Sequence, residues 1–169
     1  NWIKDVPSLE IFKSSSNKSV TGFSLLTGKH SNIMVVDIDK NHGDSSVDGE
    51  EIFEEFIKDL SEEDKQRIKS TFTVETPRGG KHLYFKYKEG LKSRSNYLPS
   101  IDIRTDSGLI VLAGSKAKID DEIREYKVLS DNNINEMPKS LFDKFIQLDT
   151  QARSKTAIIA TSGIDLIYK

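Results

Sequence analysis

A pair of carboxylates is the first feature of this sequence that could support chemistry. Asp37 and Asp39 stand two positions apart after the apolar run Ile33–Val36, so in a β-strand both side chains would lie on the same face. Two such carboxylates repel each other unless a cation lies between them, and Mg²⁺ is commonly bound by one or two carboxylates together with phosphate oxygens. The spacing is compatible with a divalent-cation site, but by itself it is explained more simply by a solvated strand end.

A glycine-containing turn supplies groups that could bind a phosphate. Gly79 and Gly80 would let backbone N–H groups approach a ligand closely, and Arg78 and Lys81 place positive charge on either side of them. In the strand expected to follow, His82 could hydrogen-bond to a phosphate or sugar oxygen. A structural histidine beside a tight turn is an equally good interpretation of this residue alone.

The segment I-D-I-R at 101–104 shows the same alternation of polar and apolar residues. In a strand, Asp102 and Arg104 would share one face, and the two isoleucines would share the other. Asp102 would add a third carboxylate, and the planar guanidinium of Arg104 suits a phosphate. A surface ion pair between the two residues is the alternative.

A calcium site is a competing interpretation of the acidic region. Asp44, Asp48 and Glu55 fit a loose calcium-loop pattern. The eighth position of such a loop is normally apolar, whereas here it is Glu51, and the preceding segment is predicted as a strand rather than a helix. We interpret the match as coincidental, with Asp48 opening an acidic helix, and keep a calcium-stabilised structural domain as an alternative function.

Hydrophobic periodicity and turn residues predict the elements that would position these groups. Two strands, 21–27 and 32–39, would be separated by a turn at 28–31. The remaining expected strands are 71–76 and 81–87 as a hairpin, 101–104 paired with 109–112, and an edge strand at 125–129. Helices are expected at 49–60, from Ser61, and at 138–148, whereas the tail from Thr150 has no clear pattern. The order indicates an α/β domain.

Three of these motifs together resemble one family. V-V-D-I-D at 35–39, T-P-R-G-G-K-H-L-Y-F at 76–85, and I-D-I-R at 101–104 with L-I-V-L-A-G-S at 109–115 are similar, in order and spacing, to a bifunctional primase–polymerase (Prim-Pol) domain. Such domains belong to the archaeo-eukaryotic primase superfamily and occur in replication proteins of plasmids, phages and mobile elements. The resemblance implies a compact α/β (α+β) fold with a mixed, largely antiparallel sheet, an RRM-like core and flanking helices.

The resemblance also implies roles for individual residues. The expected catalytic residues are Asp37, Asp39, His82 and Asp102, and the three aspartates would be the metal ligands. Contacts to the nucleotide are expected from Arg78, Gly80, Lys81, His82, Arg104 and Ser115. The sequence departs from the superfamily at Gly80, where serine is frequent, and at Leu-Ala-Gly-Ser (112–115), where a Pro-Pro-Gly-Ser-like segment is usual.

The resulting hypothesis is template-directed nucleotidyl transfer by a DNA primase/polymerase that replicates a mobile element, phage or plasmid. The cofactor would be two divalent ions, Mg²⁺ or Mn²⁺, and the partners would be a DNA template and primer, an NTP or dNTP and, by analogy, a helicase in the same chain or complex. Template phosphates would be contacted by Lys86, Lys88, Lys92 and Arg94. A non-catalytic module that binds single-stranded nucleic acid is the alternative, although such modules present stacking aromatics where this sequence places carboxylates.

Length and composition limit the other possibilities. The chain of 169 residues fits one domain, expected at 1–149, with 150–169 as a tail or the start of a following segment. Its 25 basic and 27 acidic residues give a net charge of −2, which excludes a polybasic nucleic-acid coat. The absence of cysteine excludes disulfides, thiolate zinc sites and cysteine nucleophiles. Because no apolar run or signal segment is visible, we expect a soluble, cytoplasmic protein with no membrane contact.

Overall fold

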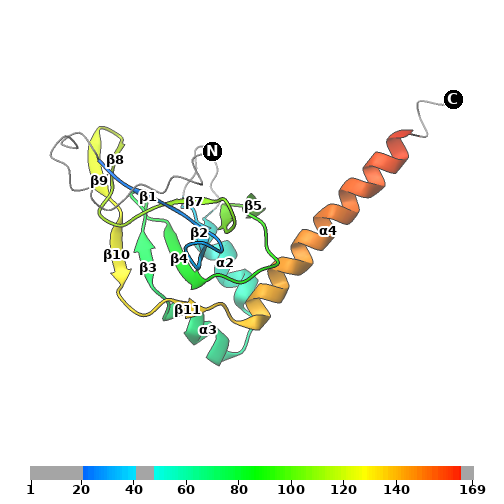
Figure 1. Ribbon diagram of the computed structural model, residues 1–169, viewed down its shortest axis with the longest axis horizontal. Coiled ribbons are helices and arrows are strands. Elements are labelled where there is room, and N and C mark those ends of the chain that lie inside the picture. Colours follow the sequence, from blue (N-terminus) through cyan, green and yellow to red (C-terminus); the bar gives the residue numbers. More distant parts are fainter. Residues whose placement is uncertain (1–20, 41–47, 165–169) are drawn as a thin grey trace.

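The apolar run that precedes the paired aspartates lies in β2 (Ile33–Ile38), an interior strand of the main sheet. The computed structural model describes residues 21–40 and 48–164, with side chains as far as residue 152 (Figure 1). The other strands are β1 (Ser24–Leu26), β3 (Thr73–Glu75), β4 (Lys81–Lys86), β5 (Arg94–Leu98), β6 (Ile101–Arg104), β7 (Leu109–Val111), β8 (Lys116–Ile119), β9 (Glu122–Glu125), β10 (Lys127–Ser130) and β11 (Asn135–Glu136). The described helices are α2 (Gly49–Ile57), α3 (Glu62–Lys69) and α4 (Lys139–Ile164).

Seven strands form the main sheet, in the order β10-β3-β4-β2-β6-β5, and β11 also joins β4. Every neighbouring pair is antiparallel except β11 with β4, which is parallel. The remaining strands form two separate pairs, β1 with β7 and β8 with β9. The predicted fold class, a mixed and largely antiparallel sheet with flanking helices, is confirmed.

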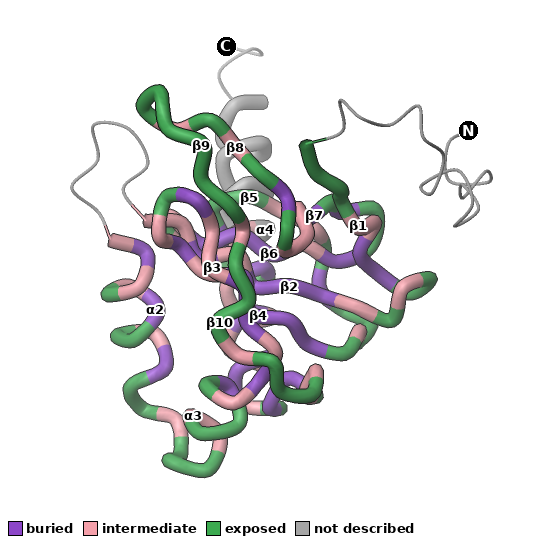
Figure 2. The backbone as a smooth tube through the Cα atoms, turned by 90° about the vertical axis from the view of Figure 1, so that its left-hand side faces the viewer, coloured by how far each residue is buried: buried purple, intermediate pink, exposed green. Residues whose placement is uncertain are grey.

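Alternation along the central strand divides the two faces of the sheet. Met34, Val36 and Ile38 point toward the helices and are buried in the larger core, with Phe53 from α2 and Phe145 from α4. Figure 2 shows that buried residues run along β2 and β4, whereas β9 and β10 are largely exposed. The larger core therefore holds the helix-covered face in place and leaves the opposite face for other contacts.

The opposite face has a smaller core beneath the short strand pairs. Val35, Val74 and Tyr84 project from β2, β3 and β4 and are buried together with Ile110 of β7. Because Asp37 is two residues beyond Val35 on the same strand, its side chain lies on this face as well. The β1–β7 and β8–β9 pairs thus enclose the surface on which the acidic residues project.

Both acidic helices begin at the predicted capping residues. The Asp48 side chain accepts a hydrogen bond from the Glu50 N–H (2.8 Å) at the start of α2, and Ser61 does the same for Asp64 (3.2 Å) at the start of α3. Asp48 also lies 3.6 Å from the Lys40 ammonium. Asp44, the first residue of the calcium-like pattern, lies outside the described residues. The role of Asp48 as a helix cap agrees with our interpretation of that pattern as coincidental.

The predicted pairing of 101–104 with 109–112 is wrong. The strand β6 pairs with β2 and β5, whereas β7 pairs with β1. The turn between them is held at Thr27, whose N–H donates to the Gly108 carbonyl (2.8 Å) and whose hydroxyl donates to the Thr105 carbonyl (2.6 Å). These bonds direct the chain after Gly108 toward β1, so a local turn signal did not produce a local hairpin.

The C-terminal helix is longer than the periodicity indicated. We expected a helix at 138–148, but α4 runs from Lys139 to Ile164 and extends away from the sheet (Figure 1). Its first turns pack Leu141, Phe142 and Phe145 into the larger core. The domain boundary expected between 149 and 150 falls inside this helix.

Candidate active site

The strand register places three of the expected site residues in one row. Asp37 of β2 pairs with His82 of β4 on one side and with Asp102 of β6 on the other. Residues directly opposite each other in antiparallel strands project from the same face and have neighbouring Cβ atoms. Three side chains that are 20 to 65 positions apart in sequence therefore lie side by side on the face opposite the helices.

The contacts within this row are close but incomplete. His82 Nε2 lies 3.4 Å from Asp37 Oδ1. Asp102 is more fully engaged, because its Oδ1 accepts a hydrogen bond from the Asn96 N–H (2.8 Å) and its Oδ2 accepts one from the Arg104 guanidinium. The ion pair that we considered for Asp102 and Arg104 is thus present within the site itself.

A cavity of about 310 Å³ opens beside the row. Five of the expected site residues line it: Asp37, Asp39, Arg78, His82 and Arg104. Its other walls come mainly from β7, from β8 and from Tyr126, and they are largely apolar. The cavity therefore combines two carboxylates, two guanidinium groups and an imidazole with a surface suited to an uncharged ring or sugar.

Burial and like charge make Asp37 electrostatically unusual. Burial, followed by the negative charges of Asp39 and Asp102, raises the pKa of Asp37 to about 7, although Arg104 opposes the shift. Its Oδ1 is buried and has no hydrogen-bond partner among the described residues. Such a carboxylate would be stabilised by a bound cation, which would neutralise the charge that the surrounding protein leaves uncompensated.

The histidine beside Asp37 is held in the neutral form. Burial is the main cause that lowers the pKa of His82 to about 4, and Arg104 lowers it further. The Val111 backbone acts in the opposite direction, but Nδ1 of His82 makes no hydrogen bond of acceptable geometry within the described ranges. At neutral pH the imidazole can therefore donate one hydrogen bond to a ligand without carrying charge.

The donor set fits a divalent cation whose coordination is completed by a ligand. Among residues 21–40 and 48–164, no three acidic or histidine side chains already form a group that could hold a metal ion. Asp37 and Asp39 nevertheless supply hard oxygen donors in one cavity, and Mg²⁺ usually keeps several positions for water or substrate phosphate. The buried, unpaired Oδ1 of Asp37 is the observation that favours such an ion.

Gly80 serves the site through close packing. A Cβ atom at this position would lie 2.4 Å from the Ile38 carbonyl oxygen and 3.3 Å from the Asp39 Cα atom. The Gly80 N–H donates to the Thr76 hydroxyl (3.0 Å), which closes the turn. Glycine therefore allows the turn that carries Arg78 to pack directly on the chain segment that carries the two aspartates.

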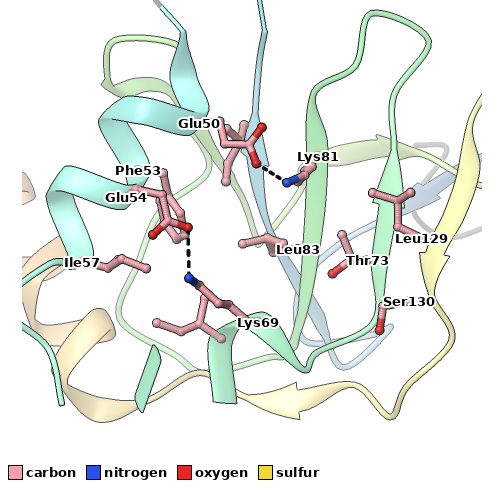
Figure 3. Close-up of a pocket in the computed structure, with 12 residues that line it drawn as sticks. Glu50, Phe53, Glu54, Ile57, Lys69, Thr73, Lys81, Leu83, Leu129 and Ser130 are labelled. Carbon is pink, nitrogen blue, oxygen red and sulfur yellow. Dashed lines mark hydrogen bonds and ion pairs between the residues drawn. The ribbon is translucent and has the colours of Figure 1, made fainter. Parts of the chain in front are cut away.

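Lys81 lies on the other side of the sheet from His82. Its ammonium group pairs with Glu50 of α2 and lines a second cavity, of about 370 Å³, between α2 and the sheet (Figure 3). Alternation along β4 explains the placement, since Lys81 and Leu83 share the face that packs against the helices. The structure therefore separates Lys81 from the other expected nucleotide contacts.

Ser115 is also outside the cavity. It is buried, its hydroxyl accepts a hydrogen bond from the Phe23 N–H (3.0 Å), and it lies 3.2 Å from the Phe23 carbonyl oxygen, to which it donates. A Cβ at Gly22 would lie 2.6 Å from the Ser115 Cβ. These contacts hold the chain before β1 against the segment that follows β7, which supports the cavity wall without contributing to it.

The basic residues expected to meet template phosphates differ in availability. Lys86 lies 3.9 Å from the Glu136 carboxylate, the Lys88 ammonium lies 4.3 Å from the centre of the Phe142 ring, and Arg94 pairs with Asp149 at 3.3 Å. Arg78, by contrast, is exposed at the cavity and has no ion-pair partner in the part of the chain that the structure describes. Arg78, which we expected to contact the nucleotide, is thus better placed to meet a phosphate than Lys86, Lys88 or Arg94.

Eight residues of the cavity were not among the predicted site residues, and three of these, Ala117, Ile119 and Tyr126, also lie outside the three motifs. The Tyr126 ring lies 5.6 Å, centre to centre, from the His82 ring. The first two belong to β8, whose pairing with β9 was not predicted because both strands are short, exposed and rich in charge. A search for aromatic residues near the third motif would have found Tyr126, although nothing in its local pattern indicates a site.

Comparison with known families identifies the fold. The family model for the bifunctional DNA primase/polymerase N-terminal domain (Prim-Pol) matches residues 4–140, which is more than half of the chain. The chain belongs to this family. The Prim-Pol match contains every residue of the row and of the cavity, and it implies DNA and nucleotides as substrates. No curated protein matches the chain.

Within the described residues, every helix is too short or too polar to cross a membrane.

Proposed function

We propose that this Prim-Pol domain catalyses template-directed nucleotidyl transfer, as a DNA primase/polymerase, with a pair of divalent ions. The proposal depends on one observation above all: Asp102, Asp37 and His82 form a single row across β6, β2 and β4, with Asp39 in the adjoining cavity. Buried and partly buried carboxylates beside the exposed Arg78 and the partly buried Arg104 are suited to a ligand that carries both cations and phosphates.

The acidic and the basic side chains would bind different parts of the ligand. Asp37 and Asp39 would hold the divalent ions, which when bound would lower the pKa of the attacking 3′-hydroxyl and offset charge on the leaving pyrophosphate. The guanidinium groups of Arg78 and Arg104 would bind the triphosphate oxygens, since a planar fork matches phosphate geometry. Neutral His82 would donate a hydrogen bond to a phosphate or sugar oxygen.

Asp102 would enter the ligand set when the substrate binds. In the structure its Oδ2 is engaged by Arg104, so a phosphate that attracts this guanidinium would release the carboxylate beside Asp37. Cation and nucleotide binding should therefore be coupled. We expect Mn²⁺ to bind at least about fivefold more tightly with a non-hydrolysable triphosphate present, the low end of typical coupling. This coupling should be lost in Arg104→Gln. Isothermal titration calorimetry of the parent and of Arg104→Gln measures it, and equal coupling in the two proteins would contradict this role of Asp102 and Arg104.

The wider setting of the reaction is part of the proposal. We infer a primed DNA template and an NTP or dNTP as substrates, Mg²⁺ or Mn²⁺ as the cofactor, and replication of a plasmid, phage or mobile element in the cytoplasm. The catalytic unit would extend over 1–149, with 150–169 as a C-terminal tail or the start of a following segment. A helicase in the same chain or complex is inferred by analogy with the family.

A primer-extension assay tests the proposal directly. Labelled primer–template is incubated with dNTPs or NTPs, in Mg²⁺ or Mn²⁺, and the products are separated by length. Extension is expected in at least one combination, and Asp37→Asn should lower it by about 100-fold or more, as loss of a main electrostatic contributor does. Asp131→Asn, which changes an exposed aspartate outside the cavity, is the matched control. Absence of extension in all four combinations would contradict the proposal.

The non-catalytic nucleic-acid-binding module has less structural support. Such a module needs aromatic faces open to bases, but Tyr84, on the same face as Asp37, is buried and packs edge-on against Phe72 with 5.2 Å between ring centres. Titration of labelled single-stranded DNA separates the alternatives. Tight binding that is independent of metal, with no incorporation, would favour the module.

A further inference from the structure

The carboxylate of Asp39 is held less directly than that of Asp37. Asp37 lies inside β2 and is paired on both sides, whereas Asp39 follows the end of this strand. Its backbone N–H donates a hydrogen bond to the Ser100 carbonyl (2.8 Å), and its own carbonyl accepts one from the Gly49 N–H (3.1 Å). Ser100 lies in the turn between β5 and β6, and Gly49 is the first residue of α2. The position of Asp39 therefore depends on a turn and a helix as well as on its own strand.

Space, rather than backbone conformation, requires a glycine at the start of α2. The φ angle of Gly49 is not in the left-handed region. A Cβ atom there would lie 2.4 Å from the Asp39 carbonyl oxygen and 2.7 Å from the Ser100 carbonyl oxygen, whereas real Cβ contacts essentially never fall below 3.0 Å. Both oxygens belong to the backbone, so neither can rotate away as the end of a side chain could. A larger residue would therefore have to separate α2 from Asp39 and Ser100.

The helix is the better anchored of these partners. Phe53 and Ile57, on the inner side of α2, are buried in the larger core. The Glu50 carboxylate also pairs with the Lys81 ammonium at the second cavity (Figure 3). Asp39, by contrast, is only partly buried and lies outside a regular strand. A methyl group added at the start of α2 would therefore displace Asp39 more readily than it would displace the helix.

We propose that Gly49 is a positioning residue for metal binding: it lets α2 close on the Asp39 backbone and so fixes the Asp39 carboxylate where it can share a divalent ion with Asp37. This inference rests on the proposed nucleotidyl transfer, because the ion is the cofactor of that reaction. Groups that orient the ligands of a metal ion typically change its affinity by about 10- to 100-fold when they are mutated. Displacing Asp39 should therefore weaken binding of the ion itself, before any nucleotide or DNA is present.

The experiment measures Mn²⁺ affinity in three proteins: the parent, Gly49→Ala and Gly108→Ala. Mn²⁺ is titrated calorimetrically into each metal-free protein, without nucleotide or DNA and well below its melting temperature. Gly108→Ala is the matched control, because a Cβ at this buried glycine would lie 2.7 Å from the Thr27 and Ser93 hydroxyl oxygens, outside the cavity. Both substitutions should lower the melting temperature through overpacking. Gly49→Ala should weaken Mn²⁺ binding by about 10- to 100-fold, whereas Gly108→Ala should change it by less than about twofold.

Loss of a helix cap gives a second, milder test that does not crowd the backbone. The Asp48 side chain accepts a hydrogen bond from the Glu50 N–H (2.8 Å), so Asp48→Ala should loosen the first turn of α2 while Gly49 stays in place. We expect Asp48→Ala to weaken Mn²⁺ binding by about 2- to 10-fold, because only part of the contribution of a cap would reach the carboxylate. Ser61→Ala removes the cap of α3, which accepts from the Asp64 N–H (3.2 Å), and as the matched control should leave Mn²⁺ affinity unchanged. If Gly49→Ala does not fold, the comparison of these two cap variants decides, and equal Mn²⁺ affinities in them would overturn the inference.

The outcomes separate this inference from the function on which it rests. A Mn²⁺ affinity in Gly49→Ala that matches the parent would overturn the role of Gly49 and leave nucleotidyl transfer intact. An equal loss in Gly49→Ala and Gly108→Ala would also overturn it, because reduced stability would then be responsible. A parent that binds no Mn²⁺ would overturn it as well, whether or not the protein extends a primer. Nucleotidyl transfer itself is contradicted by the primer-extension assay alone, and the inference would fall with it.

Discussion

Replacing Asp37 with asparagine should stabilise the metal-free protein while it abolishes activity. The folded protein raises the pKa of this carboxyl from 3.8 to about 7, so folding favours the protonated form. Stability associated with Asp37 is therefore present below pH 3.8 and is lost as the pH rises through about 7. A shift of about 3 units corresponds to about 4 kcal/mol at pH 8, at 1.36 kcal/mol per unit. An uncharged amide avoids this cost, so Asp37→Asn should raise the melting temperature by roughly 10 °C.

The assay is thermal melting of the parent and of Asp37→Asn at pH 5 and pH 8, each with and without Mn²⁺. Without metal, the variant should be more stable at pH 8, and the difference should shrink at pH 5, where Asp37 in the parent is protonated. Mn²⁺ should stabilise the parent more than the variant, because only the parent offers the full carboxylate. The exposed Asp131→Asn control should change stability by less than about 0.5 kcal/mol. A variant less stable than the parent at pH 8 without metal would refute the reasoning, since Asp37 would then stabilise the fold.

Three further predictions concern the neighbouring groups. Folding lowers the pKa of His82 from 6.5 to about 4, so as the pH falls the unfolded chain binds this proton before the folded protein does. In an Asp37→Asn background, the free energy of unfolding should therefore decrease between pH 6.5 and 4. Urea denaturation should show a decrease up to about 3 kcal/mol larger than in the same protein with His82→Gln. Arg78→Ala should raise the nucleotide KM by about tenfold with little change in melting temperature, whereas Lys81→Ala, on the opposite face, should leave KM unchanged; the reverse order would contradict the assignment. Gly80→Ala should lower both stability, by about 1–3 kcal/mol, and extension activity, because its Cβ would lie 2.4 Å from a backbone carbonyl oxygen; melting and extension at wild-type levels would show that the close approach is unimportant.

Local alternation predicted which face of its own strand Asp37, His82 and Asp102 occupy, and this part of the prediction is confirmed. Asp37 and Asp102 each lie opposite the helix-covered core, as their apolar neighbours require. The same rule, applied to Lys81, would have placed it with Leu83 and away from His82. The family resemblance, and not the pattern, led us to expect these strands to converge, because strand order depends on contacts between distant segments.

The remaining features depended on contacts that have no local signal. The strand β5 pairs irregularly with β6 and is largely polar, so neither hydrophobicity nor a turn marks it. Tyr126 lines the cavity because its backbone is hydrogen-bonded to residues 114 and 115, which are distant from the other motifs' strands along the chain. Likewise, the turn after β6 does not lead into a hairpin, because Thr27 donates hydrogen bonds to the carbonyl groups of Thr105 and Gly108. In each case a long-range backbone contact decided the structure.

The electrostatics of the row bear on why these residues are present at all. A fold selected only for stability would not bury Asp37 beside two other carboxylates, because each raises the cost of its charge. The same surface keeps the neighbouring imidazole neutral by burial and leaves Arg78 without an ion-pair partner within the described residues. These costs oppose folding of the free protein, and all of them would be reduced by a ligand that brings cations to the carboxylates and phosphates to the guanidinium groups. A metal-bound nucleoside triphosphate carries both, so the least stable arrangement in the free protein is the one that its proposed substrate would stabilise most.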